Sequence, residues 1–407
     1  MTPASREEAA LFAGAYEGRR VFVTGHTGFK GGWLALWLSR LGARVAGYAL
    51  EPPTTPSLFA AVELGELVTH TLGDVRDRRG LRAAMLRHEP EIVFHLAAQP
   101  LVRRSYDEPV ETYETNVLGT VNLLEAARAC PSLRAVVVVT SDKCYENRES
   151  GRAYREGDAL GGDDPYSSSK GCAELVTAAY RRSFFAAPSA ARVASVRAGN
   201  VIGGGDWADD RLVPDCVRAL DRGQTVAVRN PEAVRPWQSV LDPLAGYLWL
   251  GYWLLSGSAG YDGAWNFGPA SDEDLSVLAV VKAVVEAWGG GDWRAAEGGV
   301  EEPHEAGQLK LDAAKAAAQL GWRTVYDARR AVEVAVRWYK AFYEGASSAT
   351  AAAAAHPGAI GPAGVLQRCQ DDIDEYVATA RDLGLAWAGG GTAGTGAGAA
   401  AGERAEP

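Results

Sequence analysis

The chain has 407 residues, of which 47% are hydrophobic and 23% are charged, a composition typical of a globular protein with a sizeable core. Its net charge of −10 gives no basic footprint for DNA or RNA, although a local basic pocket for a phosphorylated small molecule is compatible with it. Five scattered cysteines without CxxC spacing favour reduced thiols and a cytoplasmic location over a disulfide framework or a metal site. No run approaches about 18 apolar residues and the N-terminus lacks an apolar leader, so we expect neither a membrane span nor a targeting segment.

Short apolar, β-branched runs alternate with amphipathic stretches through the first half of the chain. The expected strands, in order, are RVFVT, ARVAGY, EIVFHL, RAVVVV and RVASVRA, and a helix is expected from about Gly31. This alternation is typical of βαβ units, and it predicts an α/β fold with a Rossmann-type, doubly wound parallel sheet. A cofactor should lie at the carboxyl ends of these strands. We assign this domain to residues 18–196.

Beyond about Arg197 the pattern becomes irregular, with Gly, Pro and Trp clusters such as VIGGGDWADD and RNPEAVRPWQ. Residues 197–385 are expected to form mainly a smaller C-terminal substrate-binding domain, with room for segments that return to the Rossmann domain. Residues 387–407 are dominated by Gly and Ala and offer too little apolar surface for a core. We expect them to form a disordered tail.

The first expected strand runs into GHTGFKGG, which places Gly25, Gly28 and Gly31 at a strand-to-helix turn. Glycine lets the backbone turn tightly and approach a pyrophosphate, while the helix N-terminus offers N–H donors to the phosphates. Three glycines alone are weak evidence, because any such turn favours glycine and the spacing is GxxGxxG rather than GxGxxG. The strand before and the helix after them favour a dinucleotide site.

The next strands end in residues suited to the rest of a dinucleotide. Glu51 is a candidate acid for the adenosine ribose, but the two prolines after it leave its direction open. No arginine follows at once to hold a 2′-phosphate, which weakly favours NAD. Asp74 in GDVRD is a candidate for the adenine amine or simply a turn acid, and HLAAQ, ending at Gln99, offers small residues for the nicotinamide ribose.

Two further motifs contain side chains that can carry out chemistry. TSDK follows the run RAVVVV with Ser141, Asp142 and Lys143, and YSSSK places Tyr166 and Lys170 on one helix face. An ammonium beside a phenol favours the phenolate, which would be a usable base near neutrality. Taken alone, such a pair is usually a solvated helix face. The order of glycine turn, serine after a strand, and then tyrosine and lysine favours a catalytic role.

In this order the motifs resemble those of the extended short-chain dehydrogenase/reductase family, in which Ser/Thr, Tyr and Lys act at a nicotinamide. GHTGFKGGWL, PPTTPSLF, HLAAQPLVRRSYDEP, TSDKCYEN, RAGNVIGGGDW and RPWQSVLDPLAGYL are together similar to its dehydratases of CDP-glucose, over residues 18–385. The resemblance implies NAD as the cofactor. It implies cofactor contacts by Gly25, Thr27, Gly28, Phe29, Lys30, Gly31, Asp74, Val75, Leu96, Ala97, Ala98, Gln99, Asn116, Tyr166 and Lys170.

The same resemblance gives the charged pair after Ser141 a role. Oxidation of the sugar at C4, with Tyr166 as base, acidifies the proton at C5, and loss of water across C5–C6 then needs a base and an acid. Lys143 and Asp142 are the candidates, and lysine where related dTDP-glucose dehydratases typically have glutamate fits the CDP-sugar branch. Both must adopt their less common protonation states, so we expect them to point at the substrate rather than at each other. The alternative is a solvated strand end with a structural ion pair.

The resemblance also implies ligands for the substrate's two phosphates. The candidates are Arg103, Asn200, Arg211 and Arg235, which as isolated features would be a loop residue and surface arginines. Asp242 and Asn266 are expected to hold the smaller domain together.

A homodimer is a further expectation from the family. It would use the helices after YETNVLGT and through YSSSKGCAELVTAAY, with Leu123, Leu124, Leu175 and Val176 as candidate contacts, although these could instead face the sheet.

The expected function is the NAD-dependent dehydration of CDP-glucose to CDP-4-keto-6-deoxyglucose. A nucleotide-sugar 4-epimerase is the nearest alternative, since it would use Tyr166 and Lys170 but should not need an acid and a base after Ser141. A dehydratase of another nucleotide-glucose and a catalytically silent NAD-sensing or scaffold protein are the others.

Overall fold

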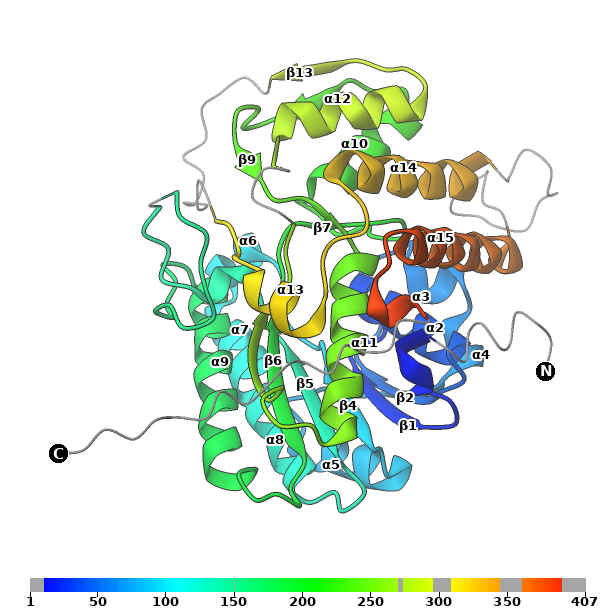
Figure 1. Ribbon diagram of the computed structural model, residues 1–407. Coiled ribbons are helices and arrows are strands. Elements are labelled where there is room, and N and C mark those ends of the chain that lie inside the picture. The colour runs from blue at the N-terminus through cyan, green and yellow to red at the C-terminus, as the bar shows by residue number, and fades with distance from the viewer. Residues whose placement is uncertain (1–10, 150, 270–273, 296–308, 345–360, 390–407) are drawn as a thin grey trace.

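The computed structural model describes residues 11–149, 151–269, 274–295, 309–344 and 361–389, and its centre is a parallel sheet (Figure 1). The seven strands lie in the order β11-β6-β5-β4-β1-β2-β3. The chain builds outwards from β1 to β3 and then crosses to β4 on the other side of β1, which confirms the doubly wound sheet and puts its switch point between β1 and β4. The strands are β1 (Arg20–Thr24), β2 (Arg44–Ala49), β3 (Thr69–Leu72), β4 (Ile92–His95), β5 (Ala135–Val139), β6 (Arg192–Arg197) and β11 (Gly263–Asn266).

Helices cover both faces of the sheet because successive strand residues point to opposite faces. In β1, Val21 and Val23 belong to the core beneath α2 (Phe29–Arg40) and α11 (Leu241–Ser256), whereas Phe22 belongs to the core on the other face. That second face is covered by α5 (Arg78–His88), α8 (Gly119–Arg128) and α9 (Pro165–Phe184). The sequence analysis did not predict β3 or β11; β3 is a short, largely exposed edge strand, and β11 comes from the segment where the alternating pattern is lost.

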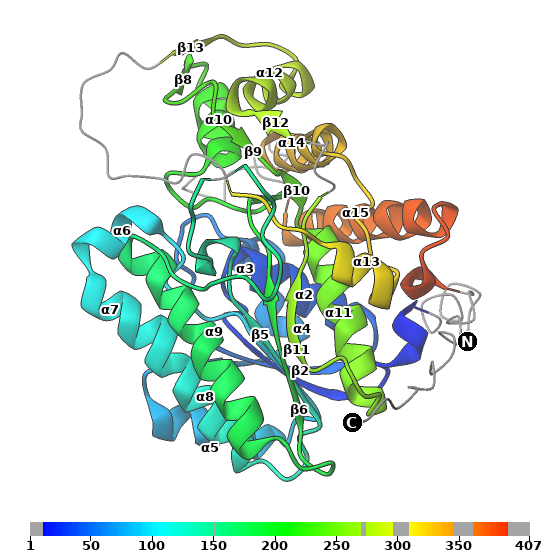
Figure 2. The same ribbon diagram turned by 60° about the vertical axis from the view of Figure 1, so that its left-hand side comes forward.

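A smaller lobe lies above the sheet in both views (Figures 1 and 2). Its helices α10 (Leu212–Asp221), α12 (Val277–Trp288) and α14 (Ala328–Glu344) pack against one another. Three two-stranded sheets accompany them: β7 (Val201–Ile202) with β10 (Gln238–Ser239), β9 (Val234–Arg235) with β12 (Leu275–Ser276), and β8 (Val226–Val228) with β13 (Trp293–Ala295). Between these segments, α11 and β11 return to the main sheet. The division at 196/197 stays a prediction.

The remaining elements are mostly short, apart from the long helix α15. They are η1 (Leu11–Gly14), α3 (Leu58–Ala61), α4 (Leu64–Leu67), α6 (Val102–Asp107), α7 (Pro109–Tyr113), the π-helical turn η2 (Glu114–Leu118), η3 (Asp142–Cys144), α13 (Ala314–Leu320), α15 (Pro362–Asp382) and η4 (Ala386–Ala388). None of the helices in the described ranges is long and apolar enough to cross a membrane.

Trp387 corrects the expected start of the tail. We expected a disordered tail from this residue, but its indole is fully buried and stacks on Phe12 with ring centroids 5.3 Å apart and on Tyr376 at 5.7 Å. Aromatic stacking and burial therefore extend the ordered core through η4. The rest of the expected tail, residues 390–407, lies outside the described residues.

The expected contact residues of a dimer are also revised. Leu123 and Leu124 are fully buried in the core beneath α8, and Val176 packs against the same core, so these three face the sheet. Leu175 has an exposed fraction of 59% and faces outwards.

Candidate active site

The turn after β5 holds Ser141, Asp142 and Lys143. Ser141 caps the turn: its Oγ accepts a hydrogen bond from the backbone N–H of Lys143 at 3.2 Å. Asp142 is buried, and its Oδ1 accepts from Ser141 Oγ and from the Lys143 N–H, each at 2.9 Å. A Cβ at Gly199 would lie 1.9 Å from Asp142 Oδ2, so the carboxylate rests against a backbone that glycine leaves open.

Lys143 is half-buried, and among the described residues its amine forms no ion pair with Asp142. The carboxylate is instead held by short-range hydrogen bonds within the turn. The two side chains therefore do not neutralise each other.

Helix α9 brings Tyr166 and Lys170 to the same turn. The helix starts at Pro165 with Asp164 as its cap, and both catalytic candidates are buried. Lys170 Nζ lies 5.9 Å from the centre of the Tyr166 ring, and Ser141 on the turn acts on the Tyr166 hydroxyl. The structure thus joins the residues of both motifs.

Burial decides the charge states of these two residues. It raises the pKa of Tyr166 to about 12, although the neighbouring Ser141 hydroxyl opposes the shift. It also lowers the pKa of Lys170 to about 8, with partial compensation from the neighbouring Cys144 and Glu174. At neutral pH the tyrosine is protonated and the lysine is charged, so the expected phenolate is not the state of the protein alone.

A buried ion pair joins the helix of Tyr166 to the sheet. Glu174 Oε2 lies 2.8 Å from Arg197 Nη2, and both side chains are 3% exposed. The carboxylate also accepts hydrogen bonds from the hydroxyls of Thr140 and Ser195, and Arg197 donates to the Tyr145 hydroxyl. Because these residues flank the catalytic turn on both sides, the network fixes the turn relative to α9.

The glycine turn lies between β1 and α2. Gly25 has a φ of +77°, and a Cβ there would lie 2.7 Å from the backbone nitrogen of Ala97. A Cβ at Gly31 would lie 2.1 Å from the oxygen of Gly25, so the helix packs directly on the turn. Gly28 precedes α2 without a side-chain cap, which leaves the N–H groups from Phe29 onwards for a ligand. An uncapped helix N-terminus beside a close turn fits a pyrophosphate.

Thr27 and Lys30, which are also expected cofactor contacts, have side chains that meet other parts of the fold. Thr27 donates its hydroxyl to the carbonyl of Leu50 at 2.9 Å. The Lys30 amine lies 5.8 Å from the centre of the Tyr247 ring. Burial lowers its pKa to about 7, helped by the charges of Arg211 and Lys170, so at neutral pH the amine is only about half protonated.

The ends of β3 and β4 place the other cofactor candidates. The carboxylate of Asp74 is bound by Arg76; partial burial raises its pKa, but the hydrogen bonds and charge of Arg76 bring it below the usual range. Val75 is buried in the core, and its carbonyl accepts a hydrogen bond from Asn122 Nδ2 at 3.0 Å. Leu96, Ala97 and Ala98 are half-buried at the end of β4.

Asn116 lies in the π-helical turn η2 and links β4 to the catalytic helix. Its Oδ1 accepts from the Gln99 N–H at 2.8 Å, and its Nδ2 donates to the Gln99 carbonyl at 3.1 Å and to Ser169 Oγ at 2.9 Å. The amide therefore holds the HLAAQ segment against α9.

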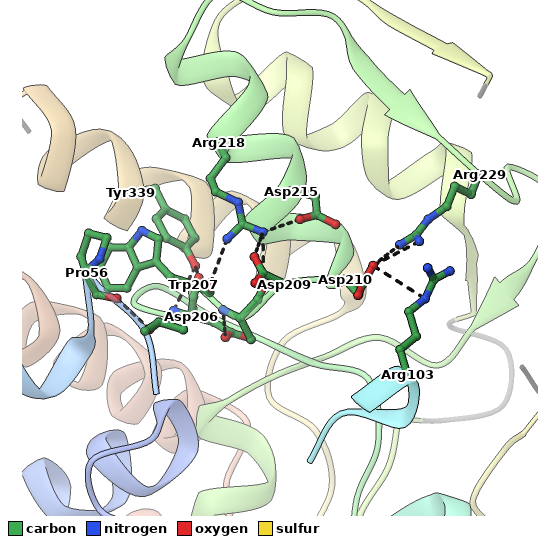
Figure 3. Close-up of polar contacts among 12 residues, drawn as sticks. Pro56, Arg103, Asp206, Trp207, Asp209, Asp210, Asp215, Arg218, Arg229 and Tyr339 are labelled. Carbon is green, nitrogen blue, oxygen red and sulfur yellow. Dashed lines mark hydrogen bonds and ion pairs between the residues drawn. The ribbon is translucent and has the colours of Figure 1, made fainter. Parts of the chain in front are cut away.

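The structure places the four expected phosphate ligands in different surroundings. Arg211 Nη1 lies 2.8 Å from Asp206 Oδ2, and its charge acts on Tyr166, so it belongs to the catalytic centre. Arg103, on α6, reaches the carboxylate of Asp210 in the smaller lobe (Figure 3). Asn200 follows Gly199 with a φ of +50°, and Arg235 lies in β9, where its guanidinium donates to the carbonyl of Val234.

Asp242 and Asn266 are structural residues, but they lie on α11 and β11 of the main sheet and not, as we expected, within the smaller lobe. Asp242 Oδ1 accepts from the Val325 N–H and the Tyr376 hydroxyl, and Asn266 Oδ1 accepts from the Tyr145 hydroxyl. Both are fully buried.

Comparison with known proteins gives the site its context. Residues 21–264 match the NAD dependent epimerase/dehydratase family. The chain belongs to this family. It is 51% identical over 335 residues to the CDP-glucose 4,6-dehydratase of Salmonella typhimurium, covering 81% of this chain and 93% of that protein. It is 28% identical to the dTDP-glucose 4,6-dehydratase of Streptomyces antibioticus, covering 84% and 99%.

Solved structures of the family have the same fold. A dTDP-glucose 4,6-dehydratase from Streptomyces venezuelae with NAD bound superposes with a TM-score of 0.66 at 25% identity, over 79% of this chain and 97% of that one. The UDP-glucose 4-epimerase of Thermus thermophilus with NAD gives 0.67 at 25% identity, over 79% and 99%. NAD is the cofactor of the epimerase/dehydratase family, and the close turn at Gly25 with the uncapped start of α2 fits its pyrophosphate.

Sequence reasoning missed several residues of the site. Glu174 and Arg197 lie in apolar segments, and a charged residue inside such a segment was the available signal. Arg229 stands in the quoted run RNPEAVRPWQ, but no local pattern distinguished it from Arg235. No sequence pattern pointed to Tyr247. Its hydroxyl is buried with no hydrogen-bond partner among the described residues.

Proposed function

We propose that the chain catalyses the dehydration of CDP-glucose to CDP-4-keto-6-deoxyglucose. The observation that carries this proposal is the turn in which a buried Asp142 and a half-buried Lys143 directly follow Ser141, beside Tyr166. An oxidation alone needs only the serine, tyrosine and lysine set; the additional acid and amine supply the groups for an elimination. The identity to the Salmonella typhimurium CDP-glucose 4,6-dehydratase supports the choice of substrate.

The first step removes hydrogen from C4 of the glucose. Tyr166, once in its phenolate form, takes the proton of the C4 hydroxyl, and Ser141, which acts on the tyrosine hydroxyl, orients the same oxygen. Lys170 stabilises the phenolate by its charge, which a pKa of about 8 preserves at neutral pH. NAD, when bound, accepts the hydride from C4 and returns it at C6, so that no cofactor is consumed.

The second step removes water across C5 and C6. The ketone at C4 acidifies the C5 proton, which a neutral Lys143 accepts. Asp142, in its protonated form, gives a proton to the departing C6 hydroxyl, and water leaves. When the hydride is returned at C6, the protonated Lys143 gives its proton back to C5, and the proton taken from the C4 hydroxyl restores Asp142 through solvent. The lack of an ion pair between the two side chains supports these separate roles. The diphosphate is assigned to Arg103, Asn200, Arg211 and Arg235.

Mass spectrometry of a reaction with CDP-glucose and NAD tests the proposal. The dehydratase yields a product lighter by one water. A 4-epimerase would give an isomer of unchanged mass, and a catalytically silent NAD-binding protein would give no product. Either of the latter two results overturns the proposal.

A thermal-shift panel with CDP-, dTDP-, GDP- and UDP-glucose tests the choice of nucleotide. Stabilisation by a ligand follows the ratio of its concentration to its dissociation constant, so CDP-glucose should give the largest shift at equal concentration. Equal shifts for all four would refute the choice of CDP.

We also propose a homodimer formed through α6, α7, η2 and α9, which lie side by side (Figure 2). Apolar side chains with exposed fractions of 38% to 69% cover this surface, namely Tyr106, Val110, Tyr113, Leu118 and Leu175. A second copy of the chain would remove such a patch from water. Light scattering should give twice the chain mass, and Leu175→Glu should give a monomer, whereas Leu383→Glu, an exposed leucine elsewhere, should leave the dimer intact. A monomeric wild type contradicts this assignment.

We further propose a cytoplasmic location. All five cysteines are free thiols, four of them buried, which suits a reducing compartment.

A further inference from the structure

Asp210 occupies a central position between two arginines from different parts of the chain (Figure 3). Its Oδ1 lies 3.1 Å from Nη2 and 3.2 Å from Nη1 of Arg229, which follows β8 in the smaller lobe. The same oxygen lies 3.7 Å from Nε of Arg103, which comes from α6 beside the sheet. One carboxylate oxygen therefore attracts guanidinium groups from both sides.

This cluster adjoins the catalytic centre. Arg211, the next residue in the chain, pairs with Asp206, and its charge acts on Tyr166. Arg103 and Arg211 are the proposed ligands of the diphosphate, so the inference here rests on the proposed function. Among the described residues, Arg103 meets the carboxylate of Asp210.

The ion pairs of Asp210 with Arg103 and Arg229 are weak enough for a ligand to replace the carboxylate. The side chains of Arg103, Arg229 and Asp210 are 31%, 39% and 44% exposed, and ion pairs at this exposure contribute little to stability. A diphosphate carries more charge than a carboxylate and offers more oxygens, and guanidinium groups bind such oxygens in pairs. The substrate can therefore displace the aspartate from both arginines.

We propose that Asp210 is a place-holder for the diphosphate of the nucleotide sugar. Before substrate binds, it holds the guanidinium groups of Arg103 from α6 and Arg229 from the lobe beside each other. When substrate binds, the diphosphate takes both guanidinium groups and Asp210 is released to water. Asp210 is thus a positioning residue, and Arg229 is a further substrate ligand.

Asp210→Asn tests this inference, with Asp209→Asn as the matched control. Both changes remove one negative charge from the same loop, but Asp209 has an exposed fraction of 88% and lies 3.5 Å from Arg218, which Asp215 also binds. The full chain with NAD is titrated with CDP by calorimetry. Loss of the competing carboxylate should lower the dissociation constant of CDP about 2- to 5-fold, as expected for partly exposed ion pairs. The control should bind CDP as the wild type does.

Three more measurements distinguish displacement of Asp210 by the diphosphate from a permanent structural ion pair. Asp210→Asn should lower KM for CDP-glucose and leave kcat unchanged. Asp210→Glu should restore the wild-type affinity for CDP, and Arg229→Gln should weaken CDP binding. If Asp210→Asn binds CDP as the wild type does or more weakly, Asp210 is a permanent support and the inference is wrong. A gain equal in both Asn variants would show a general charge effect and would also overturn it. If the wild type does not bind CDP at all, the proposed function fails together with this inference.

Discussion

Asp142→Asn separates the two steps proposed for the enzyme. The amide keeps an oxygen at the Oδ1 position, where the aspartate accepts from Ser141 Oγ and the Lys143 N–H at 2.9 Å. Its nitrogen replaces Oδ2 against Gly199 without adding volume. The fold should therefore lose less than about 1 kcal/mol, the value of one ordinary hydrogen bond.

The effect on the elimination should be much larger. An asparagine cannot give an acidic proton to the departing C6 hydroxyl, and general acid catalysis is worth roughly 10²- to 10⁴-fold. That loss corresponds to about 3 to 5 kcal/mol of activation free energy. Oxidation at C4 depends on Tyr166 and Lys170 and should continue.

The assay follows the absorbance of reduced cofactor after mixing with CDP-glucose and NAD. The variant should accumulate NADH and form little dehydrated sugar, whereas the wild type returns its hydride and should show little standing NADH. Tyr166→Phe is the control, because it blocks the first step and should give neither NADH nor product. Thermal melting of each variant confirms that it is folded. Dehydration by Asp142→Asn at the wild-type rate would show that the acid is only a charge at the end of a strand.

Three other changes test the surroundings of the site. Glu174→Gln leaves the buried guanidinium of Arg197 without its anion and should cost about 3 to 5 kcal/mol in denaturant unfolding; a loss under about 1 kcal/mol would contradict the assigned network. Lys30 has a folded pKa of about 7 against 10.5 ordinarily, so the folded chain binds fewer protons and the residue's contribution to stability rises with pH across that window. Lys30→Met should therefore raise the melting temperature more at pH 6 than at pH 9, and an equal gain at both would exclude a depressed pKa. Removal of the residues after Gly389 should leave the melting temperature unchanged, whereas Trp387→Ala should cost about 3 to 5 kcal/mol, and a large effect of the truncation would show that the tail docks on the fold.

The sheet was predictable because its central strands are buried on both faces. Such strands are continuous apolar runs, so RVFVT and RAVVVV stand out in the sequence, and the polar motifs directly after them must meet at one edge of the sheet. For this reason Ser141 and the glycine turn could be assigned before the structure. Edge strand β3, THTL, has no such run because it is largely exposed.

Contacts between distant segments left no comparable signal. The Glu174 carboxylate meets Arg197 from a neighbouring strand, and Asp210 meets Arg103 from across the sheet edge. Each partner alone is an ordinary charged residue, and its role depends on a distance that the sequence does not contain. The same applies to Trp387, whose burial depends on Phe12 at the other end of the chain.

Buried contacts hold the chemical groups on the sheet, whereas partly exposed ion pairs join the lobe to it. Tyr166, Lys170 and the turn after β5 are fixed to the sheet by buried hydrogen bonds and an ion pair, which suits chemistry that needs exact distances. Arg229 and Asp210 belong to the lobe and are joined to the sheet side by partly exposed ion pairs that a ligand can exchange. The contacts proposed for the diphosphate can therefore rearrange in the lobe while the chemical groups stay in place.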